Sequence, residues 1–278
     1  MSTVKEKIQL DELKQIELSI LKQIHAVCVQ QGFRYFLVGG TLLGAIRHKG
    51  FIPWDDDIDI GMPRADFEKF IDYCQTNDVP FDIICNRINE KYGYLFAKAM
   101  APDTVILEES GNRYNVNMGI YVDIFPIDGL GNTPEEAVKN LNKTRFNREL
   151  LVAANWKKFS RSKTHAFYYE PIRLAFFCLS RMSSFQKLIR KINSKYDVEG
   201  FDKSLYVGCV CGAYRNKEIV ERDVFSEYID IPFEDASFKC PKQYDKYLTN
   251  IYGKYMQLPP EEKRVTHHSF DAYHKKES

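Results

Sequence analysis

The stretch from residue 33 to residue 64 constrains the fold of this chain more than any other part of its sequence. An apolar run, Tyr35 to Val38, ends at Gly39 and Gly40, and a helical pattern begins at Thr41. This order predicts a strand, a tight turn and the start of a helix. Backbone N–H groups at such a junction approach a phosphate closely, because glycine has no Cβ and a helix N-terminus carries partial positive charge.

Two groups of basic side chains are predicted to donate hydrogen bonds to an anionic ligand. The first group follows the glycines within about two helical turns and comprises Arg47, His48 and Lys49. The second group follows a Pro-Pro pair that fixes the chain direction near the other end of the sequence, and it comprises Arg264, His267 and His268. The alternative for the second group is a disordered polar tail.

Four carboxylates occupy the positions between Asp55 and Asp59, directly after Trp54. Side chains alternate along a strand, so if the isoleucines of this segment face the core, Asp57 and Asp59 point together to the other side. Two carboxylates on one face repel each other unless a cation lies between them, and Mg²⁺ takes such oxygen ligands together with substrate phosphates. The alternative is an acidic surface loop, in which the first two aspartates cap or solvate a turn.

A third carboxylate, Asp123, is the one charge in the apolar run from residue 119 to residue 126. An isolated carboxylate in a buried strand is costly unless it is paired or bound to a metal. The alternative is an aspartate that ends the strand by accepting backbone N–H groups, and Asp128, just before Gly129, fits that alternative better. We therefore expect Asp57, Asp59 and Asp123 to lie on neighbouring strands as catalytic residues and metal ligands.

These motifs resemble the pattern of the nucleotidyltransferase superfamily, and the longer text from residue 39 to residue 64 resembles the LicD family of phosphotransferases. Part of the C-terminal sequence, from Tyr244 to His268, is also similar to that family. The resemblance implies an α+β fold: a nucleotidyltransferase-like mixed β-sheet core flanked by helices, with a helical insertion and a C-terminal α+β extension. The expected parts are a catalytic core in residues 1–130, a basic helical region in 131–200 and an extension in 201–278 that closes over the active site.

The resemblance also implies an activity, which is metal-dependent transfer of phosphocholine from CDP-choline to a hydroxyl of a cell-surface glycan precursor. The precursor would be that of teichoic acid, capsule or lipopolysaccharide. As an acceptor it would be either a glycan or a lipid-linked oligosaccharide. Two Mg²⁺ or Mn²⁺ ions would bridge the diphosphate, and Asp123, or a metal-bound alkoxide near it, would take the proton of the acceptor hydroxyl. The expected substrate- and phosphate-binding residues are Gly39, Gly40, Thr41, Arg47, His48, Lys49, Trp54, Arg264, His267 and His268.

Other functions stay open on the residues alone. Nothing in them decides whether CMP leaves or a nucleotide is transferred, so a conventional nucleotidyltransferase remains an alternative. Another CDP-alcohol, such as CDP-ribitol or CDP-glycerol, is a second alternative, because aromatic residues that could hold a quaternary ammonium are abundant throughout the chain. A non-catalytic binding module is a third, and three carboxylates brought together would argue against it.

The net charge of +1 hides an uneven distribution. From Lys143 to Tyr196 there are 13 Lys and Arg against 2 Glu, a net +11, which leaves −10 for the rest. Helices are expected over residues 134–156 and 171–196, where apolar and cationic residues interleave. This mixture suits peripheral contact with an anionic membrane surface. The alternatives are a helix packed on the core with a solvated basic face, and nucleic-acid binding, which no base-stacking or groove-reading motif supports.

Cysteine usage and the N-terminal sequence indicate the compartment. The 7 cysteines have no regular spacing and no signal peptide precedes them, so a reduced, cytoplasmic protein is expected. No stretch reaches the length of a membrane span. Elsewhere the patterns predict a helix over residues 10–30 and a second helix from Pro63, strands at 81–88, 94–100, 104–107 and 119–125, a hairpin at 227–240 and a helix at 243–255.

Overall fold

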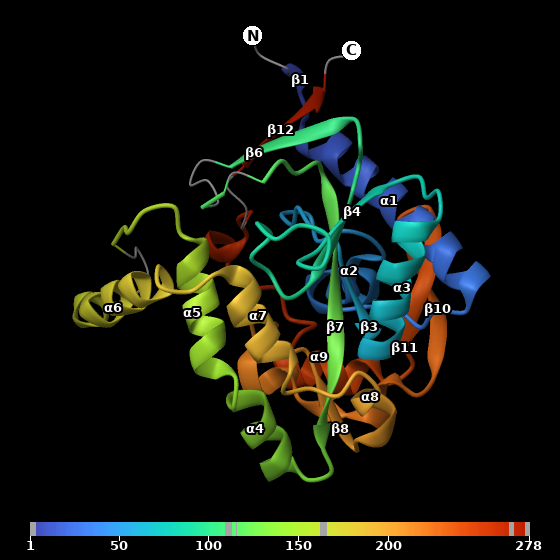
Figure 1. The fold of residues 1–278 in the computed structure, drawn as a ribbon. Coiled ribbons are helices and arrows are strands. Elements are labelled where there is room, and N and C mark those ends of the chain that lie inside the picture. The colour runs from blue at the N-terminus through green and yellow to red at the C-terminus, as the bar shows by residue number, and fades with distance from the viewer. Residues whose placement is uncertain (1–3, 109–112, 115, 162–165, 267–269, 276–278) are drawn as a thin grey trace.

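The computed structural model describes residues 4–108, 113–114, 116–161, 166–266 and 270–275 (Figure 1). It is an α+β fold, as expected. Its α-helices are α1 (Leu10–Gln31), α2 (Gly39–His48), α3 (Arg64–Thr76), α4 (Pro134–Asn142), α5 (Arg145–Asn155), α6 (Glu170–Ser180), α7 (Phe185–Asn193), α8 (Gly200–Lys203) and α9 (Tyr244–Tyr252). Short 3₁₀ turns are η1 (Phe167–Tyr169), η2 (Arg215–Glu218), η3 (Arg222–Phe225) and η4 (Glu261–Lys263).

In the part of the chain that the structure describes, the strands form three sheets. Within the described residues, the central mixed sheet has seven strands. Five of them are neighbours in the order β2 (Phe36–Leu37), β3 (Asp59–Pro63), β7 (Tyr121–Gly131), β5 (Ala97–Met100) and β4 (Asp82–Ile84). The other two are β8 (Tyr206–Gly208), which pairs with β7, and β9 (Val220–Glu221), which pairs with β8. A second sheet places β12 (Phe270–Lys275) between β1 (Val4–Lys7) and β6 (Thr104–Glu108). The third is the predicted hairpin, β10 (Tyr228–Phe233) with β11 (Ala236–Pro241).

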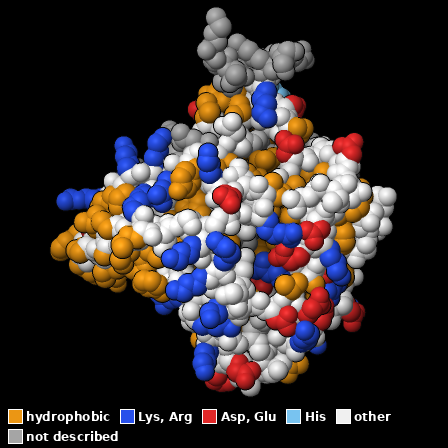
Figure 2. All heavy atoms as spheres, viewed as in Figure 1, with side chains coloured by type: hydrophobic (Ala, Val, Ile, Leu, Met, Phe, Trp, Pro, Cys, Tyr) orange, Lys and Arg blue, Asp and Glu red, His pale blue; other side chains and the backbone are white. Residues whose placement is uncertain are grey.

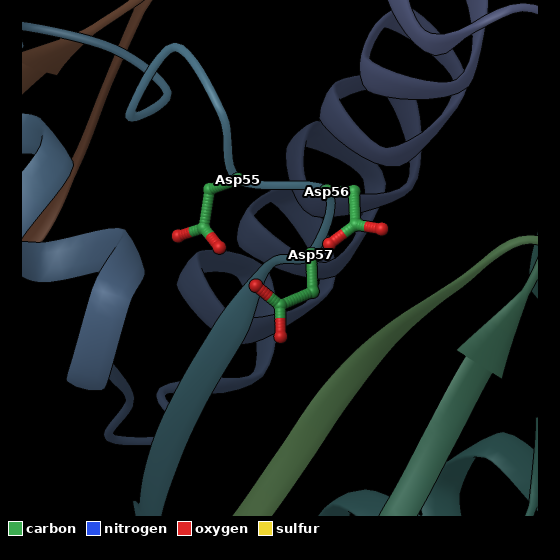
Figure 3. A group of neighbouring side chains, drawn as sticks. All are labelled: Asp55, Asp56 and Asp57. Carbon is green, nitrogen blue, oxygen red and sulfur yellow. The ribbon is translucent and has the colours of Figure 1, made fainter. Parts of the chain in front are cut away.

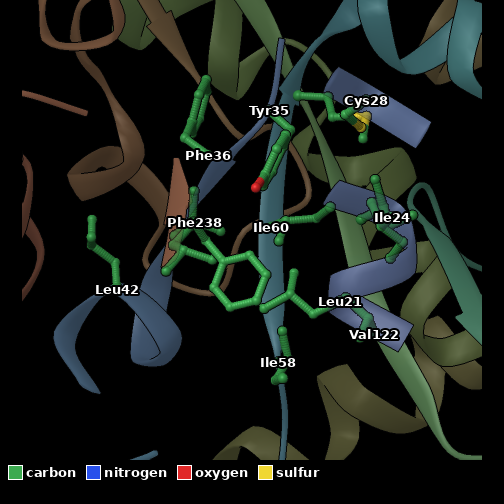
Figure 4. Close-up of a cluster of buried hydrophobic side chains, with 14 of the residues drawn as sticks. Leu21, Ile24, Cys28, Tyr35, Phe36, Leu42, Ile58, Ile60, Val122 and Phe238 are labelled. Carbon is green, nitrogen blue, oxygen red and sulfur yellow. The ribbon is translucent and has the colours of Figure 1, made fainter. Parts of the chain in front are cut away.

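Helix α1 covers the central sheet and supplies much of the main hydrophobic core. Most of its periodic apolar side chains are buried, although Leu10 is exposed and Ile16 is only partly buried, and the helix ends at Gly32 in the left-handed region with φ 71°. Figure 4 shows Leu21, Ile24 and Cys28 of α1 packed with side chains of β2, β3 and β7. The hairpin reaches the same core through Phe238, which is fully buried.

The parallel pairing of β3 with β7 positions the predicted acidic residues. Asp59 lies directly opposite Asp123 in the register, and the N–H of Asp123 donates to the carbonyl of Ile58 at 2.9 Å. This confirms that the two acidic segments are neighbours in one sheet. The strand begins at Asp59, however, so Asp57 lies in the segment that leads into β3 and not within the strand.

Three expectations differ from the structure. Each of the two long basic helices is broken: the first between Asn142 and Arg145, the second between Ser180 and Phe185. Strand β6 belongs to the sheet with β1 and β12, not to the central sheet. Asp128 does not end its strand at a turn. It is fully buried inside β7 and accepts two hydrogen bonds from the Arg64 guanidinium at 2.8 and 2.9 Å, a paired arrangement that makes a buried carboxylate tolerable.

None of the helices in the described part of the chain combines the length and the apolar composition needed to cross a membrane.

Candidate active site

The N-terminus of α2 lies beside the acidic residues of β3. Gly39 opens the helix with φ 54°, in the left-handed region, and a Cβ at this position would lie 3.2 Å from Oδ2 of Asp59. A Cβ on Gly40 would lie 2.8 Å from Oδ2 of Asp55. The glycines therefore allow carboxylates to approach the helix start, as well as giving the backbone its turn. The hydroxyl of Thr41 accepts a hydrogen bond from the N–H of Asp59 at 2.7 Å, and this bond joins the start of α2 to the start of β3.

The predicted carboxylates lie within one another's electrostatic field. Burial raises the pKa of Asp59 well above its ordinary value, and the negative charges of Asp57 and Asp123 raise it further, whereas the nearby ammonium of Lys98 lowers it. Like charges held together in this way favour binding of a cation, because a cation relieves the repulsion.

A tighter cluster is formed by Asp55, Asp56 and Asp57, on the loop that leads into β3 (Figure 3). Carboxylate oxygens of these three residues all lie within 4.8 Å of one another. This trio shares only Asp57 with the trio predicted from the sequence. Asp56, for which the sequence left a solvated turn open as the alternative, is 7 % exposed.

Lys98 is a site residue that the sequence analysis missed. It lies on β5 directly opposite Asp123, and its Nζ is 2.6 Å from Oδ1 of that aspartate. The side chain is buried, and its ammonium lies 3.3 Å from the centre of the Tyr121 ring. Asp123 is thus held by a cation of the protein itself. The signal was present in the sequence, because Lys98 is a lone charge in the apolar run from Ala97 to Ala101.

Glu17 of α1 is a second residue that was missed. It is 2 % exposed, and its Oε2 is buried with no hydrogen-bond partner. Burial raises the pKa of Glu17 well above its ordinary value, and the negative charges of Asp57 and Asp56 add to that shift. Its place on the apolar stripe of α1, between Leu13 and Leu21, was the available signal.

The predicted basic residues form a second cluster, two turns along α2 from the glycines. Nε of Arg47 donates to Nε2 of His48 at 2.9 Å, and burial lowers the pKa of both side chains. The ring of Trp54 lies edge-on to His48, with centroids 6.3 Å apart, and the Arg264 guanidinium lies 5.6 Å from the Trp54 ring centre. The structure therefore brings Arg47, His48, Trp54 and Arg264 together.

The other predicted basic residues lie elsewhere or cannot be placed. Lys49 is exposed and follows the C-terminal end of α2, where it adopts the left-handed conformation with φ 60°. A helix of that length spans about 15 Å, so the backbone of Lys49 lies far from the Gly39 turn. His267 and His268 lie outside the described residues.

A large cavity lies outside the acidic cluster, and none of the predicted carboxylates is among its lining residues. It has a volume of about 940 Å³ and lies between residues 93–96, helices α4 and α5, and the segment 211–217. Seven Lys and Arg residues line it against one glutamate, and its aromatic lining comprises Tyr94, Phe96, Trp156 and Tyr214. Such a lining suits an anionic ligand that carries a flat or cationic group.

Three tyrosines connect this cavity to the acidic site. The Tyr214 hydroxyl donates to the Tyr252 hydroxyl at 3.2 Å, and the latter lies 4.0 Å from the Cβ position of Gly39. The N–H of Gly39 itself donates to the Tyr247 hydroxyl at 3.5 Å. Burial raises the pKa of Tyr252 far above its ordinary value, so this hydroxyl stays protonated and can donate a hydrogen bond to a ligand.

The donor set fits a hard divalent cation. Carboxylate oxygens of Asp55, Asp56 and Asp57 cluster on the loop before β3, Asp59 is paired with Asp123 in the register of β3 and β7, and the unpartnered Oε2 of Glu17 is a buried oxygen on α1. Mg²⁺ and Mn²⁺ prefer such oxygen ligands. Asp57, Asp59 and Asp123 remain the predicted ligands, with Asp55 and Asp56 close to them.

The fold and this acidic site are those of a nucleotidyltransferase-type domain. A family model described as "LicD/FKTN/FKRP, nucleotidyltransferase domain" matches residues 32–167, which include the acidic loop, Lys98 and Asp123. The chain belongs to the LicD family, as the sequence motifs indicated.

Curated relatives agree with this assignment. The chain is 34% identical over 272 residues to lipopolysaccharide cholinephosphotransferase LicD of Haemophilus influenzae, an alignment that covers 96% of this chain and 98% of that protein. Ribitol 5-phosphate transferase FKRP of Mus musculus is 32% identical over 95 residues, which cover 34% of this chain and 17% of the mouse protein. The human FKRP is 30% identical over the same share of this chain.

Proposed function

We propose that this protein is a phosphotransferase that moves phosphocholine from CDP-choline to a hydroxyl of a cell-surface glycan precursor. The observation that carries the proposal is the pairing of Asp59 with Asp123 beside the N-terminus of α2, in a chain that is similar over nearly its full length to a lipopolysaccharide cholinephosphotransferase. Lipopolysaccharide is accordingly the first acceptor to test, and teichoic acid and capsule precursors are the others.

The proposed site divides the work among residues of this chain. Asp57, Asp59 and Asp123 would hold one or two Mg²⁺ or Mn²⁺ ions, which when bound neutralise charge on the phosphate oxygens. The N–H groups at Gly40 and Thr41 would orient the diphosphate, because the first N–H groups of a helix have no partner inside it.

Asp123 would accept the proton of the acceptor hydroxyl. The ammonium of Lys98 stabilises the charged carboxylate until that step, because it is buried against it at 2.6 Å. The cluster of Arg47, His48, Trp54 and Arg264 would hold the leaving CMP. The cavity would take the alcohol and acceptor groups, and its aromatic lining offers ring faces to a quaternary ammonium.

A polyol phosphate donor is the second candidate function. The similarity of 95 residues of this chain to ribitol 5-phosphate transferase favours it, and CDP-ribitol or CDP-glycerol would then replace CDP-choline. Nucleotidyl transfer from a triphosphate is the third candidate. For localisation we propose the cytoplasm, with peripheral contact at the inner face of the membrane.

A donor screen tests these candidates. Purified protein would be incubated with Mg²⁺ and, separately, CDP-choline, CDP-ribitol, CDP-glycerol, CTP or ATP, and release of CMP or pyrophosphate would be followed. We expect CMP from CDP-choline and none from the Asp59→Asn variant, which serves as the control for contaminating hydrolases. Release of CMP from another CDP-alcohol would identify that compound as the donor instead of CDP-choline, and release of pyrophosphate would indicate a nucleotidyltransferase. No release from any donor, with no metal-dependent thermal shift, would contradict enzymatic function.

A further inference from the structure

Two helices of the basic helical region, α6 and α7, differ in how far their apolar side chains are buried. Helix α7 behaves as an ordinary core helix, since Phe185, Leu188, Ile189 and Ile192 are all buried and its lysines and arginines face solvent. Helix α6 has a more apolar sequence than α7, yet only Ser180 among its residues is buried. In Figure 1, α6 projects from the body of the molecule and lies against α5 at one end.

One face of α6 packs on the protein. Arg173, Phe176, Phe177 and Ser180 recur at steps of three and four residues and therefore share a face. The Arg173 guanidinium lies 4.8 Å from the centre of the Trp156 ring, Phe177 stacks on the same ring at 6.5 Å, and Phe176 contacts Phe146. Arg173 and Trp156 also line the large cavity.

The opposite face of α6 is apolar and exposed. Ile172 and Leu179 of α6 are 55 % and 45 % exposed, Met182 in the turn that follows α6 is 81 % exposed, and Tyr168 in η1 is 62 % exposed. Phe167 in η1 is 86 % exposed. Figure 2 shows this apolar surface as a continuous area at one edge of the molecule. An apolar patch of this kind is uncommon on a protein that leaves it in water.

Positive charge borders the patch. Lys157, Lys158 and Arg161 are exposed on the segment between α5 and η1, and Figure 2 shows basic side chains beside the apolar area. Glu170 is the one acidic residue of α6, and its charge is balanced by Arg173 at 2.8 Å. Exposed apolar side chains next to exposed Lys and Arg match an anionic bilayer, whose headgroups attract the cations while its acyl boundary accepts the apolar groups.

We propose that η1 and the outward face of α6 dock on the surface of an anionic phospholipid bilayer. The docking itself needs no assumption about chemistry. If the proposed function also holds, docking has a use: Arg173 on the inward face of α6 lines the cavity, so a lipid-linked acceptor held in the same bilayer would enter the cavity from the membrane side.

Vesicle sedimentation of the full chain tests the docking without any substrate. The probes are vesicles of phosphatidylcholine alone and of phosphatidylcholine with phosphatidylglycerol. We expect binding to the anionic vesicles, and a loss of about tenfold or more in the partition coefficient for the triple variant Ile172→Gln, Leu179→Gln, Met182→Gln. The matched control is Val29→Gln, Val198→Gln, Leu205→Gln, which removes three similarly exposed apolar side chains elsewhere and should bind as the wild type does.

The other sedimentation results overturn the proposal. Wild-type protein that stays in solution with anionic vesicles, or an α6 triple variant that sediments as the wild type does, would contradict it. Wild-type self-association that the α6 variant abolishes, without vesicle binding, would assign the face to a second copy of this chain. CMP release from soluble CDP-choline is measured in parallel: if it persists in the α6 variant while vesicle binding is lost, docking is separate from the chemistry, and if no variant releases CMP, only the proposed function fails.

Discussion

The ammonium of Lys98 and the carboxylate of Asp123 face each other across neighbouring strands, 2.6 Å apart and both shielded from solvent. A buried ion pair of this kind contributes little net stability when it is intact, but removing one partner leaves an uncompensated charge. The site therefore has a fixed internal cation beside its proposed proton acceptor, in addition to any metal ion.

Lys98→Met should destabilise the protein by about 3–5 kcal/mol, because it leaves Asp123 buried without its cation. Urea unfolding would measure the loss. The double variant Lys98→Met, Asp123→Leu should recover most of it, since an apolar pair of similar volume replaces the ion pair, while CMP release should be abolished in both variants. A single variant as stable as the wild type would show that the pair does not stabilise the charge of Asp123.

Glu17→Leu should stabilise the metal-free protein by about 1–3 kcal/mol, because it removes a buried oxygen that has no hydrogen-bond partner. Thermal unfolding in the presence of a chelator would measure the change. Glu17→Gln is the matched control, since it removes the charge but keeps a buried polar group, and a smaller gain is expected from it. Lower melting temperatures for both variants would contradict the interpretation of Glu17 as an unsatisfied group.

The raised pKa of Glu218 leads us to expect that the free energy of unfolding depends on pH. Glu218 is 6 % exposed beside the cavity wall, accepts a hydrogen bond from the N–H of Tyr214, and burial raises its pKa to about 7. A carboxyl whose folded pKa exceeds its unfolded pKa favours the folded state at low pH, and this contribution is lost as the pH rises to about 7. Relative to Glu218→Gln, the wild type should lose about 3 kcal/mol of unfolding free energy between pH 4.5 and pH 8. Equal pH profiles for the two proteins would contradict the shift.

Arg264→Met should raise the KM for the CDP-alcohol about tenfold or more, because it removes a charged donor next to Trp54 without disturbing the carboxylates. Arg264→Lys keeps the charge but not the planar group, so an intermediate KM is expected. Steady-state kinetics of CMP release would measure both. A fall in kcat at unchanged KM would place Arg264 outside the donor-binding cluster.

The elements around the acidic site were predictable because local pattern and tertiary structure agree there. The period of α1, the glycines before α2 and the apolar run around Asp123 each specify one element, and the structure has all three. The broken helices were less predictable, because apolar periodicity continues across the breaks. Ser184 provided a local signal, since its side chain caps α7 by accepting the N–H of Lys187.

Lys98 and Glu17 could not be assigned to the site from sequence for a different reason. Each is a single charge within an apolar element, and such a residue acquires a role only when a partner from a distant segment lies against it. Asp123 is 25 residues from Lys98 along the chain, and only the β5–β7 register joins them. The arrangement of Arg47 with Arg264 likewise depends on how the C-terminal segment folds back, which no local pattern specifies.

Strand β7 carries its two carboxylates an odd number of positions apart, so Asp123 faces Lys98 while Asp128 faces Arg64 on the other side of the sheet. Substitutions at the intervening positions leave both orientations unchanged. A deletion or insertion of one residue between them would turn one carboxylate away from its cation. Among homologous chains, the length of this segment should therefore vary far less than its composition.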